Sequence, residues 1–337
     1  MSDYDAVIMF DPDEIIFVPT QKCNLKCSHC YVPNQPVDLS FEKACAFLCE
    51  AVKDGIDRVG FSGGEPFLNV DFVLALVKKA VSLDCIFDRI MTNGVWWRDK
   101  EELTRILQAL CEAGYDGHIA VSFDVYHNQD EHKVADFIET AYSVWQNRDC
   151  IEIVSVLDSV HPENNEKTFQ KFSKLAALLK AEVQSDEIGR VECLQFTDKI
   201  DTIFIDDREF DILPVSYIDY TPENILEPEY WKSKKWFIED FCESTGNVYY
   251  VHANGDVAVC CGYANECAGL IMGNINTMSY ALIQEKAFES CKTGFLKTVY
   301  CDGLLNAAQK LESADFPLPG KTNNNCLFCR YLLSSSH

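Results

Sequence analysis

The sequence predicts an α/β protein that combines a partial (β/α)6 barrel with a small C-terminal domain. Short apolar runs typical of buried strands alternate with longer amphipathic stretches over residues 14 to about 200. Six such alternations favour a parallel sheet with right-handed crossovers, and they are too few for the closed eight-stranded barrel. The length fits, because 337 residues with 47% hydrophobic content can bury one large core and an appended smaller one.

Each strand is expected from an apolar run rich in β-branched or aromatic residues. The runs are EIIFVP (14–19), RVGFS (58–62), IFDRIMT (86–92), HIAVSF (118–123), IEIVSVL (151–157) and RVECLQF (190–196). Helices are expected between them, over residues 40–52, 70–81, 100–113, 130–145 and 162–180. In the first helix Phe41, Cys45 and Leu48 recur at helical spacing and define one apolar face.

The alternation breaks around residues 200 to 235. Three prolines there, Pro214, Pro222 and Pro228, are typical of irregular structure. We therefore predict a barrel over residues 1–205, a linker over 206–235 and a smaller domain over 236–337.

The charge balance limits the partners. Lys plus Arg number 29 against 53 Asp plus Glu, giving a net charge of -24, which argues against a nucleic-acid partner bound through phosphate neutralisation. Such a surface is either simply solvated or attracts a cationic substrate or basic peptide. No segment approaches ~20 uninterrupted apolar residues, and the acidic N-terminus lacks an export signal. We expect a cytoplasmic protein with no membrane partner, whose 17 cysteines stay reduced.

Three of these cysteines, Cys23, Cys27 and Cys30, occupy one short loop, CNLKCSHC, after the first strand. Parallel barrels build their active sites at this carboxyl edge. Three thiolates suit zinc or an iron-sulfur cluster, or the residues are simply core cysteines. Zinc would need a fourth ligand, and His29 is poorly placed beside Cys30 to supply it. A 4Fe-4S cluster on three cysteines leaves one iron open for a substrate or cofactor.

CNLKCSHC resembles the CxxxCxΦC signature of the radical S-adenosylmethionine (SAM) superfamily, with His29 in the aromatic position. FSGGEPFL, residues 61–68, resembles the GGEP motif of that family. The resemblance implies a 4Fe-4S cluster on Cys23, Cys27 and Cys30, whose open iron binds the amino and carboxylate groups of SAM. It also implies one-electron cleavage of SAM to methionine and a 5′-deoxyadenosyl radical, with a flavodoxin- or ferredoxin-type electron donor.

Six further residues are expected to bind SAM. Gly63 and Gly64 let backbone approach the methionine moiety, where a side chain would block it, and Glu65 can pair with the ammonium group. Polar residues that end the third and fourth strands are contacts to the methionine and ribose by resemblance: Asn93, Ser122 and Asp124. The alternatives are an ordinary turn for the two glycines and strand-end capping for the polar residues.

A second cysteine group follows the predicted linker. Cys242, Gly255 and Cys260 resemble the Cx(9-15)Gx4C opening of the SPASM and twitch domains, and Asn254-Gly255 signals a hairpin that would bring Cys242 and Cys260 close. Because a full SPASM domain continues with more cysteines, we predict one auxiliary 4Fe-4S cluster in a twitch-like domain, with zinc on the same ligands as an alternative. The expected ligands are Cys242, Cys260, Cys326 and Cys329, with Cys267, Cys291 and Cys301 as competitors.

The doublet Cys260-Cys261 suggests a catalytic thiol. Successive side chains on a strand point to opposite faces, so Cys261 would point away from the cluster that Cys260 binds. Its weak S-H bond could give a hydrogen atom to a carbon radical, and the alternatives are a packing cysteine or exchanged ligand roles. TNGVWW, SFDVYH and the H-x-x-G-x4-C-C pattern resemble the peptide epimerases that mature epipeptides. That group has an acidic residue where this chain has Gly246 to Val248.

The resulting hypothesis is a radical SAM enzyme that removes a hydrogen atom from a peptide or small natural product and epimerises a carbon centre. The alternative among enzymes is thioether cross-linking or dehydrogenation. The alternative of another class is a non-catalytic iron-sulfur or zinc protein, which would need no GGEP motif. The chain has no room for the ~80-residue leader-binding module that many peptide-modifying relatives carry, so the substrate is expected to be a short peptide or a metabolite.

Overall fold

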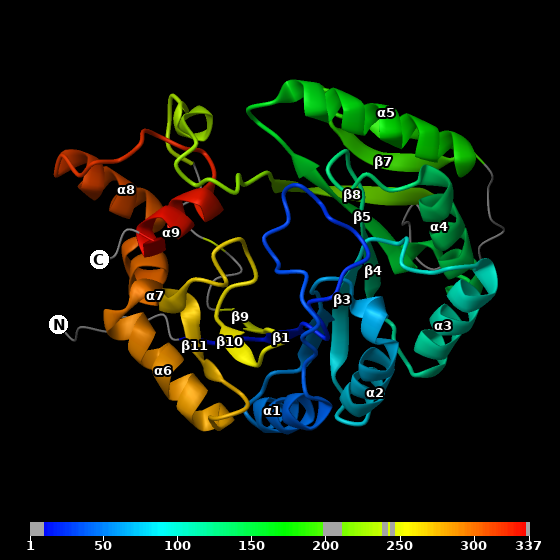
Figure 1. Cartoon of the computed structure of the whole chain (residues 1–337), viewed down its shortest axis with the longest axis horizontal. Coiled ribbons are helices and arrows are strands. Elements are labelled where there is room, and N and C mark those ends of the chain that lie inside the picture. Colours follow the sequence, from blue (N-terminus) through cyan, green and yellow to red (C-terminus); the bar gives the residue numbers. More distant parts are fainter. Residues whose placement is uncertain (1–9, 198–210, 238–241, 243–246, 335–337) are drawn as a thin grey trace, which may run out of the picture. The chain divides into compact units, whose positions relative to one another are not determined.

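The computed structural model describes residues 10–197, 211–237, 242 and 247–334. Contacts within the chain divide it into two compact units, each of which is visible in Figure 1. The barrel unit comprises Pro19–Asp38 and Val59–Tyr220. The hairpin unit comprises Met1–Val18, Leu39–Arg58 and Thr221–His337. The domain boundaries predicted at 205 and 236 stay a prediction.

The barrel unit is an α/β structure with strand order β2-β3-β4-β5-β8-β7-β6. The pairs β3-β4, β4-β5 and β5-β8 are parallel, so the predicted fold class with its mostly parallel sheet is confirmed. The strands are β2 (Arg58–Phe61), β3 (Ile86–Thr92), β4 (His118–Ser122), β5 (Ile151–Leu157), β6 (Ala181–Ser185), β7 (Val191–Phe196) and β8 (Ile212–Asp219). The helices are α2 (Val70–Val81), α3 (Lys100–Glu112), α4 (Glu131–Trp145) and α5 (Pro162–Leu178), with short 3-10 turns at Pro66–Asn69 and Arg148–Cys150.

The prediction of a sixth parallel strand over residues 190–196 is wrong. These residues form β7, which pairs antiparallel with both β6 and β8. The cause is a tight turn, in which the Gly189 N-H donates to the Asp186 carbonyl over 3.0 Å, and such a turn joins only antiparallel strands. The parallel strand is β8, inside the predicted linker, where Pro214 had indicated irregular structure. Pairing of β8 with β5 begins at Val215, just after this proline.

Helices of the barrel unit follow from capping and periodicity. Asp99 accepts a hydrogen bond from the Glu102 N-H at the start of α3, and Asp130 accepts one from the His132 N-H at the start of α4. The residues of α3 that are buried share one face at helical spacing: Leu103, Ile106, Leu107 and Leu110.

The hairpin unit has strand order β11-β10-β9-β1. Its strands are β1 (Glu14–Phe17), β9 (Val248–Val251), β10 (Asp256–Ala258) and β11 (Ile271–Asn274). β1 pairs parallel with β9, which is why the N-terminal segment groups with the C-terminal part of the chain. The helices are α1 (Phe41–Lys53), α6 (Tyr280–Thr293), α7 (Phe295–Lys297), α8 (Leu304–Ser313) and α9 (Asn325–Ser334), with short 3-10 turns at Pro228–Trp231 and Ala268–Leu270 and a π-helical segment at Thr298–Asp302.

The predicted hairpin at Asn254-Gly255 is confirmed. β9 and β10 pair antiparallel on either side of it. Gly255 has φ 90°, a left-handed conformation that favours glycine, and its N-H donates to the His252 carbonyl over 2.8 Å.

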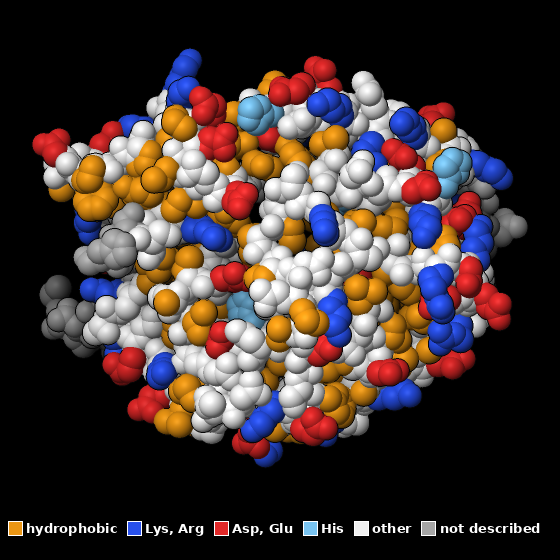
Figure 2. Space-filling model, in the orientation of Figure 1, with side chains coloured by type: hydrophobic (Ala, Val, Ile, Leu, Met, Phe, Trp, Pro, Cys, Tyr) orange, Lys and Arg blue, Asp and Glu red, His pale blue; other side chains and the backbone are white. Residues whose placement is uncertain are grey.

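The visible surface is mixed in charge. Figure 2 shows acidic and basic side chains interspersed over the region of α3 and α4 in Figure 1. On this face the net negative charge is therefore not gathered over those helices. Among the described residues, no helix combines the length and apolar character that crossing a membrane requires.

Candidate functional site

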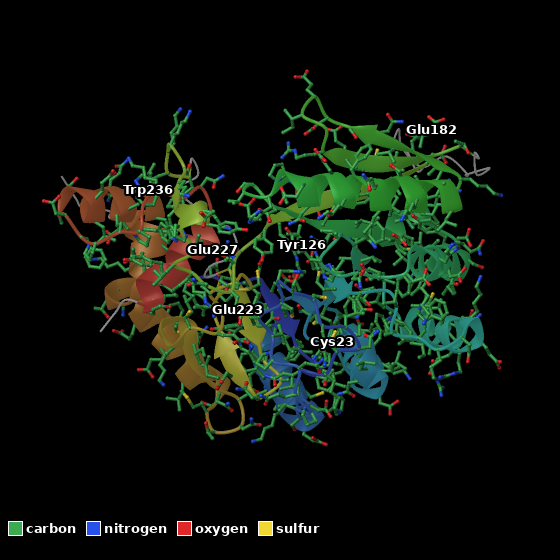
Figure 3. The ribbon with its side chains drawn as sticks, turned by 45° about the horizontal axis from the view of Figure 1, so that its top comes forward. Cys23, Tyr126, Glu182, Glu223, Glu227 and Trp236 are labelled. Carbon is green, nitrogen blue, oxygen red and sulfur yellow. The ribbon has the colours of Figure 1, made fainter. Side chains whose placement is uncertain are left out.

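The cluster loop, residues 23–30, lies in the barrel unit, where Figure 3 labels Cys23. Asn34 holds the loop in place: its Oδ1 accepts from the Cys23 N-H over 3.1 Å and its Nδ2 donates to the Cys23 carbonyl over 2.9 Å. Burial raises the pKa of the Cys27 thiol to about 12, and negative charge on Cys30 and Cys23 adds to this shift. The three thiols thus lie close enough to interact, and a cluster would have to displace their protons.

Gly64 is required by a close approach of backbone to backbone. A Cβ at this position would stand 2.3 Å from the Lys22 carbonyl oxygen and 2.5 Å from that of Gln21. The Gly64 N-H donates to the Thr20 carbonyl over 3.1 Å, and the Glu65 N-H donates to the Lys22 carbonyl over 2.8 Å. The space that Gly64 leaves is therefore filled by the segment leading into the cluster loop, so the expected access of SAM at Gly64 stays a prediction. Gly63 has φ 143°.

Glu65 lies at the centre of a buried hydrogen-bond group. Its Oε1 accepts from the Thr92 hydroxyl over 2.9 Å and from the Phe67 N-H over 3.2 Å, and its Oε2 accepts from the Asn93 N-H over 2.8 Å. The side chain is 1% exposed, and burial raises its pKa to about 7. Glu65 thus ties the loop after β2 to the end of β3, and pairing with an ammonium group stays a prediction.

Asn93 connects the end of β3 to the cluster loop. Its Nδ2 donates to Asn24 Oδ1 over 2.8 Å and to Cys23 Sγ over 3.8 Å. Its Oδ1 accepts from the Val95 N-H over 2.9 Å. These contacts orient Asn93 toward the cysteine loop, and the expected contact with SAM stays a prediction.

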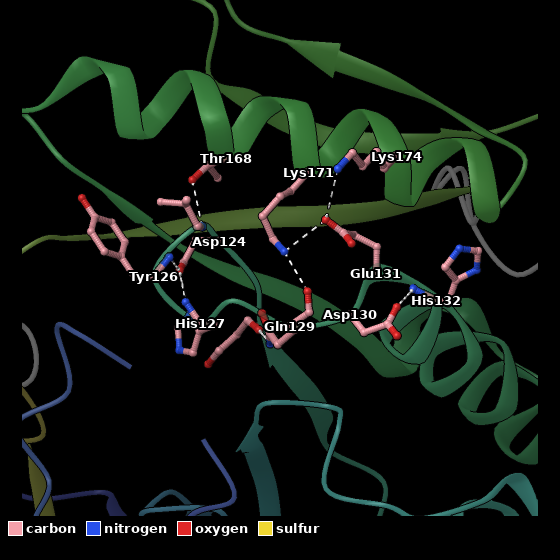
Figure 4. A network of polar contacts seen from close by, with 12 residues as sticks. Asp124, Tyr126, His127, Gln129, Asp130, Glu131, His132, Thr168, Lys171 and Lys174 are labelled. Atoms are coloured by element: carbon pink, nitrogen blue, oxygen red, sulfur yellow. Dashed lines mark hydrogen bonds and ion pairs between the residues drawn. The ribbon is translucent and has the colours of Figure 1, made fainter. Parts of the chain in front are cut away.

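Gln129 was missed by sequence reasoning. Its Nε2 donates to the Asn93 carbonyl over 2.8 Å and also to the Ser122 carbonyl, so it bridges the ends of β3 and β4. Lys171 from α5 in turn donates to the Gln129 carbonyl over 2.9 Å, and Figure 4 shows this group. Gln129 immediately precedes the α4 cap Asp130, and no motif marks it, because its role depends on contacts with two strands.

Asp124 forms a pair with His127 after β4 (Figure 4). Its Oδ1 accepts from the Tyr126 N-H over 2.8 Å and lies 2.8 Å from His127 Nδ1. Burial opposes ionisation of Asp124, but the His127 ring and its contacts hold the pKa of the carboxyl below its ordinary value. The site therefore contains a buried carboxylate next to an imidazole.

His29 packs into this group through its ring. Its centroid lies 4.7 Å from that of His127 and 5.4 Å from that of Tyr126, both edge to face. Burial, followed by the charge of His127, lowers the pKa of His29 to about 4. His29, which occupies the aromatic position of the signature, thus packs against two rings, and its role in cofactor binding stays a prediction.

Three buried acceptor or ring atoms here have no hydrogen-bond partner among the described residues: His29 Nδ1, Asp124 Oδ2 and Gln129 Oε1. Buried acceptors normally find donors. An ammonium group and ribose hydroxyls supply such donors, so the residues present fit SAM. Asp124 and Gln129 would accept from it, and the three cysteines of the loop would hold its cluster.

In the hairpin unit the four expected cluster ligands interact electrostatically. Burial raises the pKa of the Cys329 thiol, and charge on Cys326, Cys260 and Cys242 raises it further. Gly262, which sequence reasoning missed, lies among them: its N-H donates to Cys260 Sγ over 3.3 Å, and a Cβ there would stand 3.1 Å from Cys326 Sγ. Four thiols that influence one another have the chemistry of an iron-sulfur site, and the auxiliary cluster stays a prediction.

Cys260 and Cys261 lie just beyond β10, which ends at Ala258. The strand alternation used to separate their directions therefore does not apply here, and the expectation that Cys261 points away from the cluster stays a prediction. Their exposure nevertheless differs, since Cys260 is buried and Cys261 is half-buried. The donor role of Cys261 stays a prediction.

Two of the three competing cysteines, Cys267 and Cys291, have side chains that the structure describes. Cys267 is the last of the four cysteines that raise the pKa of Cys329. Cys291 is buried on α6 near Tyr249. The side chain of Cys301 lies outside the described residues. Within the described part of the chain, no group of three or more His, Cys, Asp or Glu side chains is arranged to hold a single metal ion.

Comparison with known proteins finds a matching family model and several relatives. Residues 17–160 match the family model of the Radical SAM superfamily. A GTP 3′,8-cyclase of Lactiplantibacillus plantarum is 27% identical over 238 residues, which cover 68% of this chain and 61% of that protein. A pre-heme d1 synthase of Dinoroseobacter shibae is 37% identical over 84 residues, or 24% of this chain and 20% of that protein. The chain thus spans less than two thirds of the length of either relative.

A solved structure has a similar fold. The structure of native anSMEcpe with bound AdoMet and Cp18Cys peptide has a TM-score of 0.50 and 16% identity, and the alignment covers 87% of this chain and 88% of that chain.

Replacement of Gly64 by Ala should displace the cluster loop. The new Cβ would collide with two backbone oxygens, and backbone atoms cannot move aside by a rotamer change, so we expect a loss of roughly 2 kcal/mol or more in the free energy of unfolding. Urea unfolding measures this. Gly189→Ala is the control, because Gly189 has φ 83° but nothing within 4 Å, and it should cost only ~1 kcal/mol. Equal losses would contradict the steric explanation.

The raised pKa of Glu65 predicts a pH dependence of stability. Between the unfolded pKa near 4.5 and the folded pKa of about 7, the folded chain holds a proton that the unfolded chain has lost. The stabilisation is therefore complete below about pH 4.5 and is lost as the pH rises through 7, by roughly 3 kcal/mol. Urea unfolding of the cluster-free chain at pH 5 and pH 8 should show this loss, and Glu65→Gln should reduce it. Glu101→Gln, at an exposed position, is the control and should leave the pH dependence of the free energy of unfolding unchanged.

Proposed function

Because residues 17–160 form a radical SAM domain, we propose that this chain is a radical SAM enzyme that inverts a carbon centre of a peptide, with Cys261 as the hydrogen donor. The supporting observations are the resemblance of the H-x-x-G-x4-C-C pattern to peptide epimerases and the position of Cys261, a half-buried thiol next to Cys260. In the proposal Cys260 binds a cluster and Cys261 contacts the substrate.

The cofactors of the proposal are SAM with one 4Fe-4S cluster, and a second 4Fe-4S cluster in the hairpin unit. When bound, SAM and its cluster supply a 5′-deoxyadenosyl radical. The ligands in the barrel unit would be Cys23, Cys27 and Cys30. The auxiliary ligands would be Cys242, Cys260, Cys326 and Cys329, with Gly262 leaving room between two of the sulfurs.

Inversion requires two hydrogen transfers on opposite faces. The substrate carbon would first lose a hydrogen atom to the 5′-deoxyadenosyl radical, which leaves 5′-deoxyadenosine and a planar carbon radical. The Cys261 S-H bond then breaks, and its hydrogen atom adds to the other face of that carbon. The thiyl radical that remains would take up one electron and one proton, and a flavodoxin- or ferredoxin-type donor would supply the electron. Cys260, next to Cys261 in the chain, would help to hold the auxiliary cluster.

Peptide substrates have support from the resemblance to peptide epimerases and from the similar solved structure, anSMEcpe, which has a bound peptide. A nucleotide substrate is the second candidate, because several curated relatives are named GTP 3′,8-cyclase. The net charge of -24 disfavours a triphosphate relative to a neutral or cationic peptide. Incubation of the reconstituted enzyme with GTP separates these candidates, and thioether formation or dehydrogenation would appear as a changed product mass.

Replacement of Cys23, Cys27 and Cys30 together by Ala should abolish formation of 5′-deoxyadenosine. About four irons per chain should remain, because the hairpin unit would keep its own cluster, and Mössbauer spectra with iron analysis would count both. The matched control changes three helical cysteines, Cys45, Cys49 and Cys111, to Ala and should keep both clusters. Reductive SAM cleavage by the first variant would show that Cys23, Cys27 and Cys30 do not hold the SAM-cleaving cluster. Zinc in the hairpin unit would refute the auxiliary cluster.

Removal of the Cys261 thiol should separate hydrogen abstraction from inversion. With peptide substrate in deuterated water, the wild type should place one solvent deuterium on the inverted carbon, as read by mass spectrometry and chiral analysis. Cys261→Ala should still form 5′-deoxyadenosine but lose the inverted product. Cys261→Ser should behave alike, because an O-H bond is too strong to donate a hydrogen atom to a carbon radical. Inversion by either variant would remove Cys261 from the donor role.

A further inference from the structure

A cavity of about 620 Å³ lies within the barrel unit, between α5, the turn joining β6 to β7, and β8. Its volume is in the range of ligand-binding pockets. Its wall is mainly apolar, with Val156, Leu157, Pro162, Phe169, Phe172 and Ile188 among the lining residues. The proposed reaction uses none of these residues.

Two apolar side chains of the wall are exposed to solvent. Ile188, in the turn, is 76% exposed, and Phe169, on α5, is 39% exposed. Exposed large apolar side chains around a hollow mark binding surfaces, because their burial by a partner releases ~25 cal/mol per Å². The hollow therefore favours an apolar group from another molecule.

The cavity opens at the same sheet edge as the candidate site. Leu157 ends β5, and β8 runs parallel to β5 and ends beside it. β6 runs in that direction too, because two antiparallel pairings separate it from β8, so the turn 186–190 lies at the carboxyl edge. From the end of β4 to β7 there are three strand spacings, or about 14 Å. An extended peptide of about four residues covers that distance.

Two residues of the cavity wall also hold the site in place. Asn165 accepts from the Asp158 N-H over 3.0 Å, and Asp158 accepts from the Tyr126 hydroxyl over 2.6 Å. Thr168 accepts from the Val125 N-H over 3.1 Å, next to Asp124. Helix α5 therefore contributes to two features. Its side chains line the cavity, and Asn165 and Thr168 also position the segment after β4.

Acidic residues outnumber basic ones, three to one, in the charged part of the cavity wall and the adjoining turn 186–190. Glu166 lines the cavity, and Asp186 and Glu187 directly precede Ile188 in the turn. Arg190 also lines the cavity, but its Nε is bound to Asp186 over 2.8 Å. Positively charged groups on either side of the bound apolar residue would complement these acidic residues.

We propose that this cavity binds an apolar side chain of the peptide substrate, flanked by Lys or Arg and about four residues from the modified carbon. The inference rests on the proposed function for its peptide, but the cavity itself needs neither cluster nor SAM. Binding here would fix the register of an extended substrate, so that one chosen carbon reaches the site.

The test measures binding without turnover. A fluorescein-labelled hexapeptide, KKFLKG, is titrated against the reconstituted full chain, and fluorescence anisotropy gives the affinity. Ile188→Asn should weaken binding about tenfold, because an exposed isoleucine contributes burial worth ~1.5 kcal/mol or more. Ile218→Asn is the matched control, since Ile218 is 54% exposed on β8 but is not part of the cavity wall. Both changes are at exposed positions, so neither should impair folding.

Charge and location are tested separately. EEFLEG should bind at least tenfold more weakly than KKFLKG, and Glu166→Gln should lower affinity for the basic peptide and reduce its salt dependence. Hydrogen exchange with KKFLKG should protect residues 162–170 and 186–191. Equal affinities of the two isoleucine variants, equal binding of both peptides, or protection elsewhere would overturn the proposal. These outcomes are independent of the Cys261 experiment, so failure of the inversion hypothesis would leave the cavity result intact.

Discussion

The buried carboxylate of Glu65 is the interaction on which the candidate site depends. It accepts hydrogen bonds from a hydroxyl and two backbone N-H groups, and these come from the loop after β2 and the end of β3. Next to it, Gly64 allows the backbone at Gln21 and Lys22 to approach, so the segment leading into the cluster loop is held against the same loop. These donors lower the pKa of the Glu65 carboxyl, but burial outweighs them, so its ionisation above pH 7 still costs stability.

The polar residues around Glu65 divide into two kinds. Asn93 and the amide nitrogen of Gln129 use their donors within the protein, and they fix the spacing between the cluster loop, β3 and β4. Asp124 and Gln129 each retain one buried oxygen with no hydrogen-bond partner among the described residues. Donors that are used within the protein and buried acceptors that are not are what a preorganised site for a cationic, hydroxyl-bearing cofactor requires.

The cysteine thiols of the hairpin unit present a second electrostatic problem. Several thiols must approach one another, although their charges repel and their burial opposes ionisation. A metal cluster removes that repulsion by binding the thiolates, so its formation would stabilise the surrounding loops. Gly262 provides the space between Cys260 and Cys326, and the adjacent Cys261 remains half-buried.

Local signals in the sequence determined much of this protein. The parallel α/β class, β1 to β5, the hairpin at Asn254-Gly255 and the cysteine loop all follow from periodicity, turn residues and short motifs, which act over a few residues. Tertiary structure decided the rest. β8 replaced 190–196 as the parallel strand because the tight turn at Gly189 reverses the chain, and Gln129, Gly262 and the wall of the cavity gain their roles from distant segments. Such roles arise from long-range packing, and neither spacing nor composition along the chain records which segments will meet.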